Sequence, residues 1–359
     1  MGPSANRITA CLCYVQAVQL IKCFTLRRTT VIIFAMSVAM HILVTCTKAK
    51  HFEPLRSLVM RQIKEVSPAA RARAWIKRIV RSHGRGVAAT DLYAGDHWLI
   101  SNQLPVESAR NGFKPTLWVI SAGYGLISAS AKVQPYSAAF SPRHPDCVTS
   151  DLDPSSDTAG FQAWWQTISK WRGPVAGAPR SFAELVRRNR RAKFVVIASE
   201  LYLQAVWHDV LEGAEALGKH FAEQLLIISA GTSDFGCLSK CALAIDARLQ
   251  SQLSGARRSL NVRAARRVLL TFRPSDRFSK IRTEYAALLA ASKPVVSIHR
   301  ERARDEEVLV FIKKSLSKSA TASASRLLQK FRVGGRACEQ KRFGRLYLIA
   351  TETPRAKSH

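Results

Sequence analysis

Two stretches of the chain combine a polar side chain with a backbone that can approach a ligand closely. A buried strand is predicted at Leu117–Ile120, and it runs directly into Ser121–Gly125. A second apolar run, Leu225–Ile228, ends in Ser229–Gly231. Ligands of open α/β sheets bind outside the carboxyl ends of parallel strands, and glycine has no Cβ to keep a ligand away. The repeated Ser-Ala-Gly ending therefore predicts one sheet with a shared ligand-binding edge.

The charge of the chain points to a polyanionic partner. The 359 residues carry a formal net charge of +30, while 47% of them are hydrophobic. That apolar content is typical of a globular protein with room for one large domain and an appendage, or for two domains. A basic excess of this size favours nucleic acid, DNA or RNA, through phosphate neutralisation and counterion release. The alternatives are a secreted cationic protein and a protein that binds anionic membranes.

Metal and cofactor chemistry has no motif in this sequence. The eight cysteines lack the paired spacing of a zinc site, and Cys237 and Cys241 are the only close pair after the N-terminal region. We expect free thiols in a reducing cytoplasm. Phosphate-loop, dinucleotide, nucleophile-elbow and zinc-protease motifs are absent. His144–Cys147 resembles a deaminase zinc box only in part, because the His-x-Glu and Pro-Cys-x-x-Cys elements are missing. We therefore predict no metal site and no cofactor.

The N-terminal region has two interpretations. Residues 1–39 contain basic but no acidic residues, and Thr30–Cys46 is apolar over about the minimum length that spans a membrane. This segment is either an anchor or targeting peptide, or an extension before the true start at Met40. In the second interpretation, which we favour, Met40–Cys46 is the first strand of the sheet and the protein is cytoplasmic.

The order of predicted elements indicates an α/β domain over residues 40–312. Strands alternate with amphipathic helices, which predicts a three-layer, mostly parallel sheet with helices on both faces. Ser181 with Glu184 forms the pattern of a helix cap, and the aromatic stripe of Trp164, Trp165 and Trp171 is assigned to the core. Beyond the strands already named, the predicted elements are a strand at Phe194–Ser199, a possible strand or turn at Pro294–Ile298, and helices at Glu53–Val80, Phe161–Trp171, Ser181–Asn189, Leu201–Leu217 and Ile245–Leu270.

A small basic tail is predicted after a linker. Residues 313–323 are rich in Ser, Ala and Lys, and residues 324–348 form two short amphipathic patterns separated by Gly334-Gly335. This is the outline of a helix-turn-helix; a basic helical hairpin packed on the main domain is the alternative. The residues predicted to contact nucleic acid are Arg257, Arg258, Arg263, Arg266 and Arg267 in the basic helical segment, and Arg326, Lys330, Arg332, Lys341 and Arg342 in the tail.

Four motifs resemble a family of bacterial α/β domains. They are Ile42–Lys48, Asp91–Gly95, Ile120–Ile127 and Pro135–Phe140. Together they are similar to the YaaA-like proteins and to the carboxy-terminal region of archaeosine synthase, which acts on a deazaguanine base in tRNA. The motifs cover about residues 40–145, and the remainder is similar only in strand order. The resemblance implies a nucleobase or nucleic-acid context such as DNA protection, base modification or defence against phage.

The resemblance also implies a set of site residues. Cys46 and Lys48 match the Cys/Ser-x-Lys ending of the first strand, and Lys50 continues it. A lysine at such a strand end suits a phosphate or carboxylate. Cys46 is either a nucleophile, since a neighbouring ammonium favours the thiolate, or a small buried residue. The residues expected to line the same edge are Tyr93, Gly95, Ser121, Gly123, Tyr124, Gly125 and Tyr136.

Further polar residues extend this candidate site. Ser229 and Gly231 end the second Ser-Ala-Gly strand, within the edge segment Ser229–Ser233. Asp246 and Asn261 follow it and can read a base edge or cap helices. Asp96 and His97 can serve as acid/base groups or as capping residues. The predicted catalytic residues are Cys46, Lys48, Ser121 and Tyr124.

Three functions remain open from the sequence. As an enzyme, the protein acts on a nucleobase or its glycosidic link, and Lys48, Ser121 and Tyr124 converge on one pocket. As a non-enzymatic module, it binds DNA or RNA through an Arg-rich face running from Arg187–Arg191 through the basic helical segment to the tail, and the Ser-Ala-Gly edge has no polar pocket. As a membrane-tethered cationic protein, it leaves the first apolar run exposed rather than paired in the sheet.

Overall fold

The chain forms two compact units in the computed structural model, Met1–Ser292 and Lys293–His359. The structure describes residues 37–152, 157–231, 235–293, 301–319 and 321–352, and the backbone of a short pair, β1 (Thr25–Leu26) with β2 (Thr29–Thr30). The rest of the predicted N-terminal extension, the predicted element at Pro294–Ile298, and Thr232 and Ser233 of the predicted edge lie outside the described residues. The first unit ends about twenty residues earlier than the predicted boundary at 312.

A six-stranded sheet organises the first unit. Its order is β10-β9-β8-β3-β5-β6, and every neighbouring pair is parallel except β5 with β6. The strands are β3 (Val38–Thr45), β5 (Phe113–Ser121), β6 (Gly125–Ser128), β8 (Lys193–Ile197), β9 (Leu225–Ala230) and β10 (Ala242–Ile245). The four strands predicted from apolar runs are confirmed. Their signal was clear because parallel strands are buried on both faces and therefore have continuous apolar sequences.

Two strands of this six-stranded sheet were not predicted, and each has a local reason. Gly125 has a φ of +71°, which only glycine adopts readily, so the chain reverses there and β6 pairs antiparallel with β5. β10 is four residues long and contains Ala242 and Ala244, which have little preference for strands. Both lie at the edges of the sheet.

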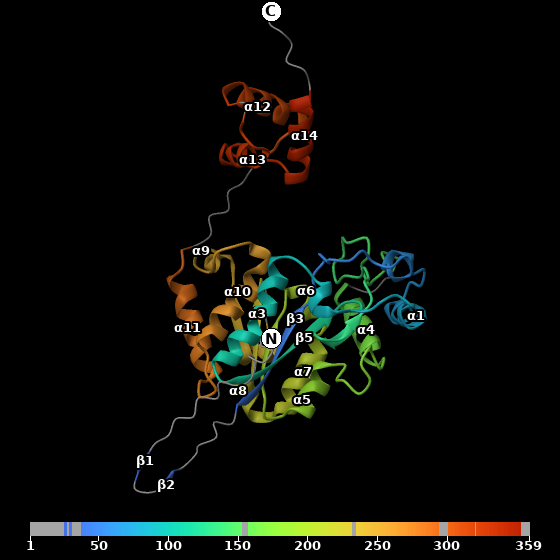
Figure 1. Ribbon diagram of the computed structural model, residues 1–359, viewed down its shortest axis with the longest axis vertical. Coiled ribbons are helices and arrows are strands. Elements are labelled where there is room, and N and C mark those ends of the chain that lie inside the picture. Colours follow the sequence, from blue (N-terminus) through green and yellow to red (C-terminus); the bar gives the residue numbers. More distant parts are fainter. Residues whose placement is uncertain are drawn as a thin grey trace, which may run out of the picture. The chain divides into compact units, whose positions relative to one another are not determined.

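Helices cover both faces of this sheet (Figure 1), which confirms the predicted mostly parallel α/β architecture. On one side α3 packs against α10, and α11 packs on β10. On the other side α1 packs on α4, α4 on α6, and α5 on α7. The bounds are α1 (Pro68–Arg81), α3 (Asp96–Arg110), α4 (Asp157–Ser169), α5 (Phe182–Arg188), α6 (Glu200–Ala205), α7 (Trp207–Leu217), α10 (Leu260–Thr271) and α11 (Phe278–Ala291).

The predicted helices are correct in kind but three have wrong extents. The helix predicted at Glu53–Val80 begins only at Pro68, after two 3-10 turns at Arg56–Leu58 and Met60–Gln62. The helix predicted at Leu201–Leu217 breaks at Val206 into α6 and α7. The segment Ile245–Leu270 contains the end of β10, two 3-10 turns, the short α9 (Gln250–Leu253) and only then α10.

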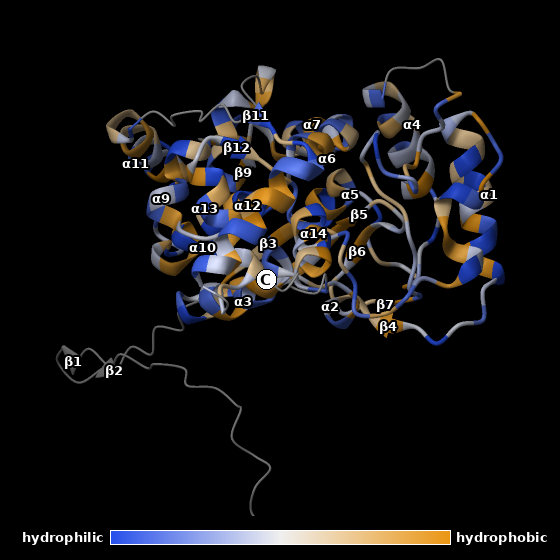
Figure 2. Ribbon diagram, turned by 90° about the horizontal axis from the view of Figure 1, so that it is seen from above, coloured by the Kyte–Doolittle hydropathy of each residue, from blue (hydrophilic) through white to orange (hydrophobic). Residues whose placement is uncertain are grey.

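Local patterns that depend on neighbouring residues were predicted correctly. The Ser181 side chain accepts a hydrogen bond from the Glu184 backbone at 3.1 Å and caps α5. Trp164 and Trp165 are buried in the core. Helix α1 carries both polar and apolar residues (Figure 2), and its buried face includes Trp75 and Ile79.

The chain path creates a switch point between β3 and β8. From β3 the chain crosses to β5 on one side, and after β6 it returns to β8 on the other side of β3. In open α/β sheets such a reversal leaves a crevice outside the carboxyl ends of the two strands, where ligands bind. Thr45 and Ile197 end the two strands here.

The second unit is a small helical body with its own core. It contains α12 (Asp305–Lys318), α13 (Ala324–Val333) and α14 (Gln340–Glu352), and its short strands β11 (Glu301–Arg302) and β12 (Arg336–Ala337) pair in parallel. Buried residues such as Ile312, Phe331 and Phe343 hold the helices together. Residues 313–318 of the predicted linker therefore belong to a third helix, which the two-helix prediction omitted.

Candidate anion-binding site at the end of strand β3

A cavity of about 350 Å³ opens at the carboxyl end of β3, beside the switch point. Its polar lining comes from the residues that follow β3, from α6 and from the loop between β7 (Lys132–Val133) and α4. The lining residues are Cys46, Thr47, Lys48, Ala138, Ala139, Phe140, Ser141, Arg143, His144 and Tyr202. Two of the four predicted catalytic residues, Cys46 and Lys48, are among them.

The wall that carries Arg143 and His144 is fixed by the contacts of two buried charged residues, Asp146 and Arg71. Asp146 accepts hydrogen bonds from Arg61 Nε at 3.0 Å, Arg61 Nη2 at 3.2 Å and Ser137 Oγ at 2.6 Å. Arg71, which is buried, donates to the carbonyls of Val148 at 2.9 Å and Cys147 at 3.4 Å. Charge-assisted contacts of this kind hold a loop more firmly than neutral ones, so they fix the path of this wall.

His144 faces the cavity as a neutral ring. Its Nδ1 accepts a hydrogen bond from the Asp146 backbone N–H at 3.0 Å, so the proton of the neutral ring resides on Nε2. Burial lowers the pKa of His144, the positive charges of Lys48, Lys50 and Arg61 lower it further, and Asp146 partly offsets them. Cavity charge at neutral pH therefore comes from Lys48 and Arg143, while His144 contributes an N–H donor.

Cys46 contacts a tyrosine hydroxyl at the floor of the site. Its Sγ lies 3.1 Å from Tyr202 Oη, and its backbone N–H donates to the Ile120 carbonyl at 3.0 Å. Burial raises the pKa of Tyr202 well above its usual value, and the nearby Cys46 raises it further, so the hydroxyl stays protonated. A protonated hydroxyl can donate to sulfur.

Lys50 lies behind this cavity rather than in its lining. Its Nζ is 4.6 Å from the ring centre of Tyr136 and 5.8 Å from that of Tyr93, and it donates to the Thr47 carbonyl at 3.3 Å. Burial lowers the pKa of Lys50, while Cys46 and Asp146 act in the opposite direction. The ammonium is stabilised by ring faces and a carbonyl.

The end of β5 is closed, unlike the end of β3. Tyr136 Oη lies 2.8 Å from Ser121 Oγ and 3.0 Å from Tyr93 Oη, and all three residues are fully buried. Burial raises the pKa of both tyrosines, so the network is neutral. Ser121, Tyr93 and Tyr136 thus stabilise the fold of the edge and do not line the cavity.

The remaining residues of the Ser121–Gly125 segment are also engaged by the protein. Tyr124 Oη donates to the Gln134 carbonyl at 3.2 Å, and its backbone N–H donates to Ser121 Oγ at 3.1 Å. Trp75 Nε1 donates to the Gly123 carbonyl at 2.8 Å, and a Cβ at Gly123 would overlap the ring of Tyr136. The predicted convergence of Lys48, Ser121 and Tyr124 on one pocket is therefore wrong: only Lys48 lines it.

On the face of the sheet that α3 and α10 cover, polar residues connect these two helices near the ends of β3 and β8. Arg263 Nη2 is 2.8 Å from Asp96 Oδ1, and Asn261 Nδ2 donates to the Ala198 carbonyl at 2.8 Å. His97 bonds to the backbone of Thr45, and burial is the main cause that lowers its pKa to about 4. Gly95, with a φ of +93°, precedes α3 and permits this turn. Asp96 and Asn261 act here as structural ties.

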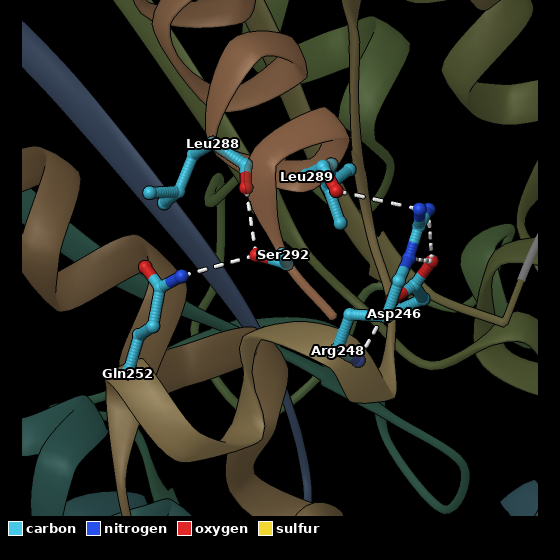
Figure 3. A network of polar contacts seen from close by, with 6 residues as sticks. All are labelled: Asp246, Arg248, Gln252, Leu288, Leu289 and Ser292. Atoms are coloured by element: carbon cyan, nitrogen blue, oxygen red, sulfur yellow. Dashed lines mark hydrogen bonds and ion pairs between the residues drawn. The ribbon is translucent and has the colours of Figure 1, made fainter. Parts of the chain in front are cut away.

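The β9 and β10 ends hold no part of the cavity. Ser229 is fully buried and Gly231 adopts a φ of +92° after β9. Asp246 accepts from the Arg248 backbone N–H at 2.8 Å and pairs with its guanidinium at 2.7 Å, and Arg248 Nη1 donates to the Leu289 carbonyl at 3.3 Å (Figure 3). Asp246 thus caps a turn, which fits the capping interpretation, and Arg248 ties this turn to α11.

Several predicted nucleic-acid contacts are engaged in ion pairs. Arg266 Nε is 2.7 Å from Glu107, and Arg263 pairs with Asp96 as described. Arg187 pairs with Glu212 and Arg188 with Glu184. Arg257, Arg258 and Arg267 are exposed.

The basic residues of the second unit also form two groups, those that bond to other residues of the protein and those that are exposed. Arg342 Nη2 is 2.6 Å from Asp305, and Arg332 Nη2 donates to the Cys338 carbonyl at 3.0 Å. Arg326, Lys330 and Lys341 are exposed. These three side chains can bind a partner without losing a hydrogen bond or ion pair shown within the described part of the unit.

The second half of the cavity was not predicted from the sequence. Arg143, His144 and Tyr202 lie about 100 to 160 residues after Cys46, and the sequence indicates His144 only as part of an incomplete zinc box. A signal was present for two of them, because Arg143 and His144 sit in a loop directly after the Pro135–Phe140 motif. Tyr202 gave no such signal, since the sequence indicates only that it lies in the predicted helix Leu201–Leu217.

Comparisons with known proteins add no relative. No protein-family model, no curated protein and no solved structure matches the chain. Within the described residues, no helix has both the length and the apolar character needed to cross a bilayer. β3 lies in the middle of the sheet, so the apolar run from residue 38 onward is paired rather than exposed.

Proposed function

We propose that the first unit binds a phosphate-bearing nucleotide in the cavity at the end of β3, and that the protein acts on or with nucleic acid. One observation supports this most directly: Lys48 and Arg143 line a cavity beside the switch point of a mostly parallel sheet. Open α/β sheets bind their ligands at this place. The motif resemblance to YaaA-like domains supports a nucleobase context, including base modification or phage defence.

The lining of the cavity suits such a ligand. A volume of about 350 Å³ is at the lower end of the usual range for small-molecule sites, and a mononucleotide is of that order. Lys48, Arg143 and the Nε2–H of His144 supply donors for phosphate oxygens. Ala138, Ala139 and Phe140 supply an apolar wall for the rest of the ligand.

Calorimetric titration with the four ribonucleoside monophosphates tests this proposal. We expect binding that weakens with salt, and at least tenfold lower affinity in Lys48→Ala and in Arg143→Ala, because each loses a charge-assisted contact. Lys77→Ala, which removes an exposed lysine of α1, is the matched control. The proposal is contradicted if Lys48→Ala and Arg143→Ala bind as tightly as Lys77→Ala, or if the intact protein does not bind.

A second candidate function is non-enzymatic binding of DNA or RNA by the basic second unit. Arg326 and Lys330 on α13 and Lys341 on α14 are exposed, and residues 334–339 separate the two helices. Such a pair of helices resembles the helix-turn-helix outline predicted from the sequence. Exposed arginines of the first unit, such as Arg257 and Arg258, would add phosphate contacts.

Salt dependence separates the two candidates. If the second unit contacts phosphates, Arg326→Ala with Lys330→Ala and Lys341→Ala lowers the slope of log affinity against log salt by about 0.9 for each lost contact. Lys48→Ala should leave that slope unchanged. The opposite pattern assigns nucleic-acid binding to the cavity, and an unchanged slope in both variants contradicts this second function.

A further inference from the structure

Cys46 differs from the other cysteines in the described part of the chain. Cys147, Cys241 and Cys338 are buried, and burial raises the pKa of Cys241 to about 12. Cys237 is exposed on a 3-10 turn. Cys46 is only 7% exposed, yet it lines a cavity that also contains Lys48 and Arg143. A reagent that reaches Cys46 must therefore enter a cationic site.

The sulfur of Cys46 lies close to a hydrogen-bond donor and to positive charges. Tyr202 Oη lies 3.1 Å from Sγ and remains protonated, so it can donate a hydrogen bond to a sulfur anion. Lys48 shares the cavity, and Lys50 is close enough for its charge to interact with that of Cys46. Nearby cations and hydrogen-bond donors are the features that activate cysteine nucleophiles.

We propose that Cys46 is a nucleophile toward a small anionic electrophile, whose charged group is held by Lys48 and Arg143. This inference rests on the proposed function, because both use the same cavity, and it adds a covalent step to it. The sulfur electron pair forms a bond to the electrophilic carbon of the ligand. The bond from that carbon to its leaving group breaks, and the leaving group departs with its electrons.

His144 does not act as the base in this step. Its Nδ1 is occupied by the Asp146 N–H, and its Nε2 already carries the proton of the neutral ring. The thiol proton therefore passes to water before attack. His144 Nε2–H is available instead to hydrogen-bond an oxygen of the bound anion.

The experiment compares iodoacetate with iodoacetamide on the intact protein, with peptide mapping by mass spectrometry. The two reagents form the same sulfur–carbon bond and release iodide, but only iodoacetate is an anion. We expect the iodoacetate-to-iodoacetamide rate ratio to be at least about tenfold higher at Cys46 than at Cys237, because a cleft lined by positive charge concentrates anions. Sulfate, which does not titrate near neutral pH, should protect Cys46 and leave Cys237 unaffected.

Variants give the decisive outcomes. In Lys48→Ala with Arg143→Ala, the ratio at Cys46 should fall to that at Cys237, whereas Lys77→Ala should leave it unchanged. Slow reaction of Cys46 with both reagents, or equal ratios at the two cysteines, overturns the inference. Nucleotide binding by Cys46→Ser is measured in parallel. If the variant binds nucleotide while Cys46 fails to react in the intact protein, the covalent step alone fails; if nothing binds, the proposed function fails as well.

Discussion

Strands β3 and β5 lie side by side and end at the same edge of the sheet, but their ends have opposite properties. After β3, the chain places Cys46 and Lys48 in a cavity that Arg143 and His144 complete. After β5, Ser121 bonds to two buried tyrosines, and tryptophan side chains bond to the carbonyls of Ala122 and Gly123. Small residues after β5 therefore make room for aromatic side chains of the protein, whereas the end of β3 leaves room for a ligand.

The difference shows why a glycine-bounded strand end is an ambiguous signal. Glycine permits close approach by any group, and at Gly123 that group is the ring of Tyr136. Charged residues from separate segments distinguish the open end of β3 from the closed end of β5. Four predictions test this contrast, starting with the largest expected effect.

Gly123→Ala should lower the free energy of unfolding by about 3 kcal/mol, because an added Cβ overlaps the ring of Tyr136 in a packed core. Urea unfolding followed by tryptophan fluorescence measures the loss. Tyr136→Leu in the same background should restore part of it, since the two changes are in contact and not additive. No loss in the single variant would show that the β5 end is not tightly packed.

Acid and alkali should destabilise the two strand ends separately. His97, bonded to the Thr45 backbone, has its pKa lowered to about 4 in the folded protein. Because the unfolded chain binds the proton more tightly, stability falls as the pH drops below the ordinary histidine value, by about 2 kcal/mol between pH 7 and pH 5. His97→Gln should flatten this dependence.

At the β5 end, the raised pKa values of Tyr93 and Tyr136 have the opposite consequence. Stability is retained up to about pH 10 and falls above it, because the unfolded chain loses tyrosine protons first. Urea midpoints measured across pH test both limbs. A fall in stability at acid pH that persists in His97→Gln would assign it to other groups, such as His41.

Lys48→Ala should weaken nucleotide binding by about 1.4 kcal/mol, a factor of ten, and leave the urea midpoint unchanged. The lysine lines the cavity, and no hydrogen bond to another described residue is shown for it. Titration calorimetry and urea unfolding on the same preparation measure the two quantities. A shifted urea midpoint with normal nucleotide binding would show that Lys48 stabilises the fold and does not contact the ligand.

Tyr93→Phe should have the smallest effect, a loss of about 1 kcal/mol in unfolding free energy with unchanged nucleotide affinity. It removes one hydroxyl from the network with Ser121 and Tyr136 while keeping the ring under Lys50. A tenfold loss of affinity would indicate that the hydroxyl network contributes to ligand binding after all.

The sequence alone determined the class of the fold and the edge of the sheet at which the cavity opens. Apolar runs at Met40–Cys46, Leu117–Ile120 and Leu225–Ile228 are local signals, because a strand buried on both faces must be apolar throughout. The cap at Ser181 is equally local, since its partner lies three residues away. Lys48 was predicted at the edge where the cavity lies because it directly follows a strand.

Only the tertiary structure decided which strand end is open. Tyr202 reaches Cys46 across 156 positions of the chain, and Tyr136 closes over Ser121 and Gly123 through a loop whose path no periodicity specifies. The ion pairs of Arg263 and Arg266 with α3 are likewise set by helix packing. A sequence shows which residues are charged or small, but the neighbours of these residues follow from the packing of distant segments. That packing buries the Ser-Ala-Gly ending of β5 in the core and leaves a cavity at the end of β3.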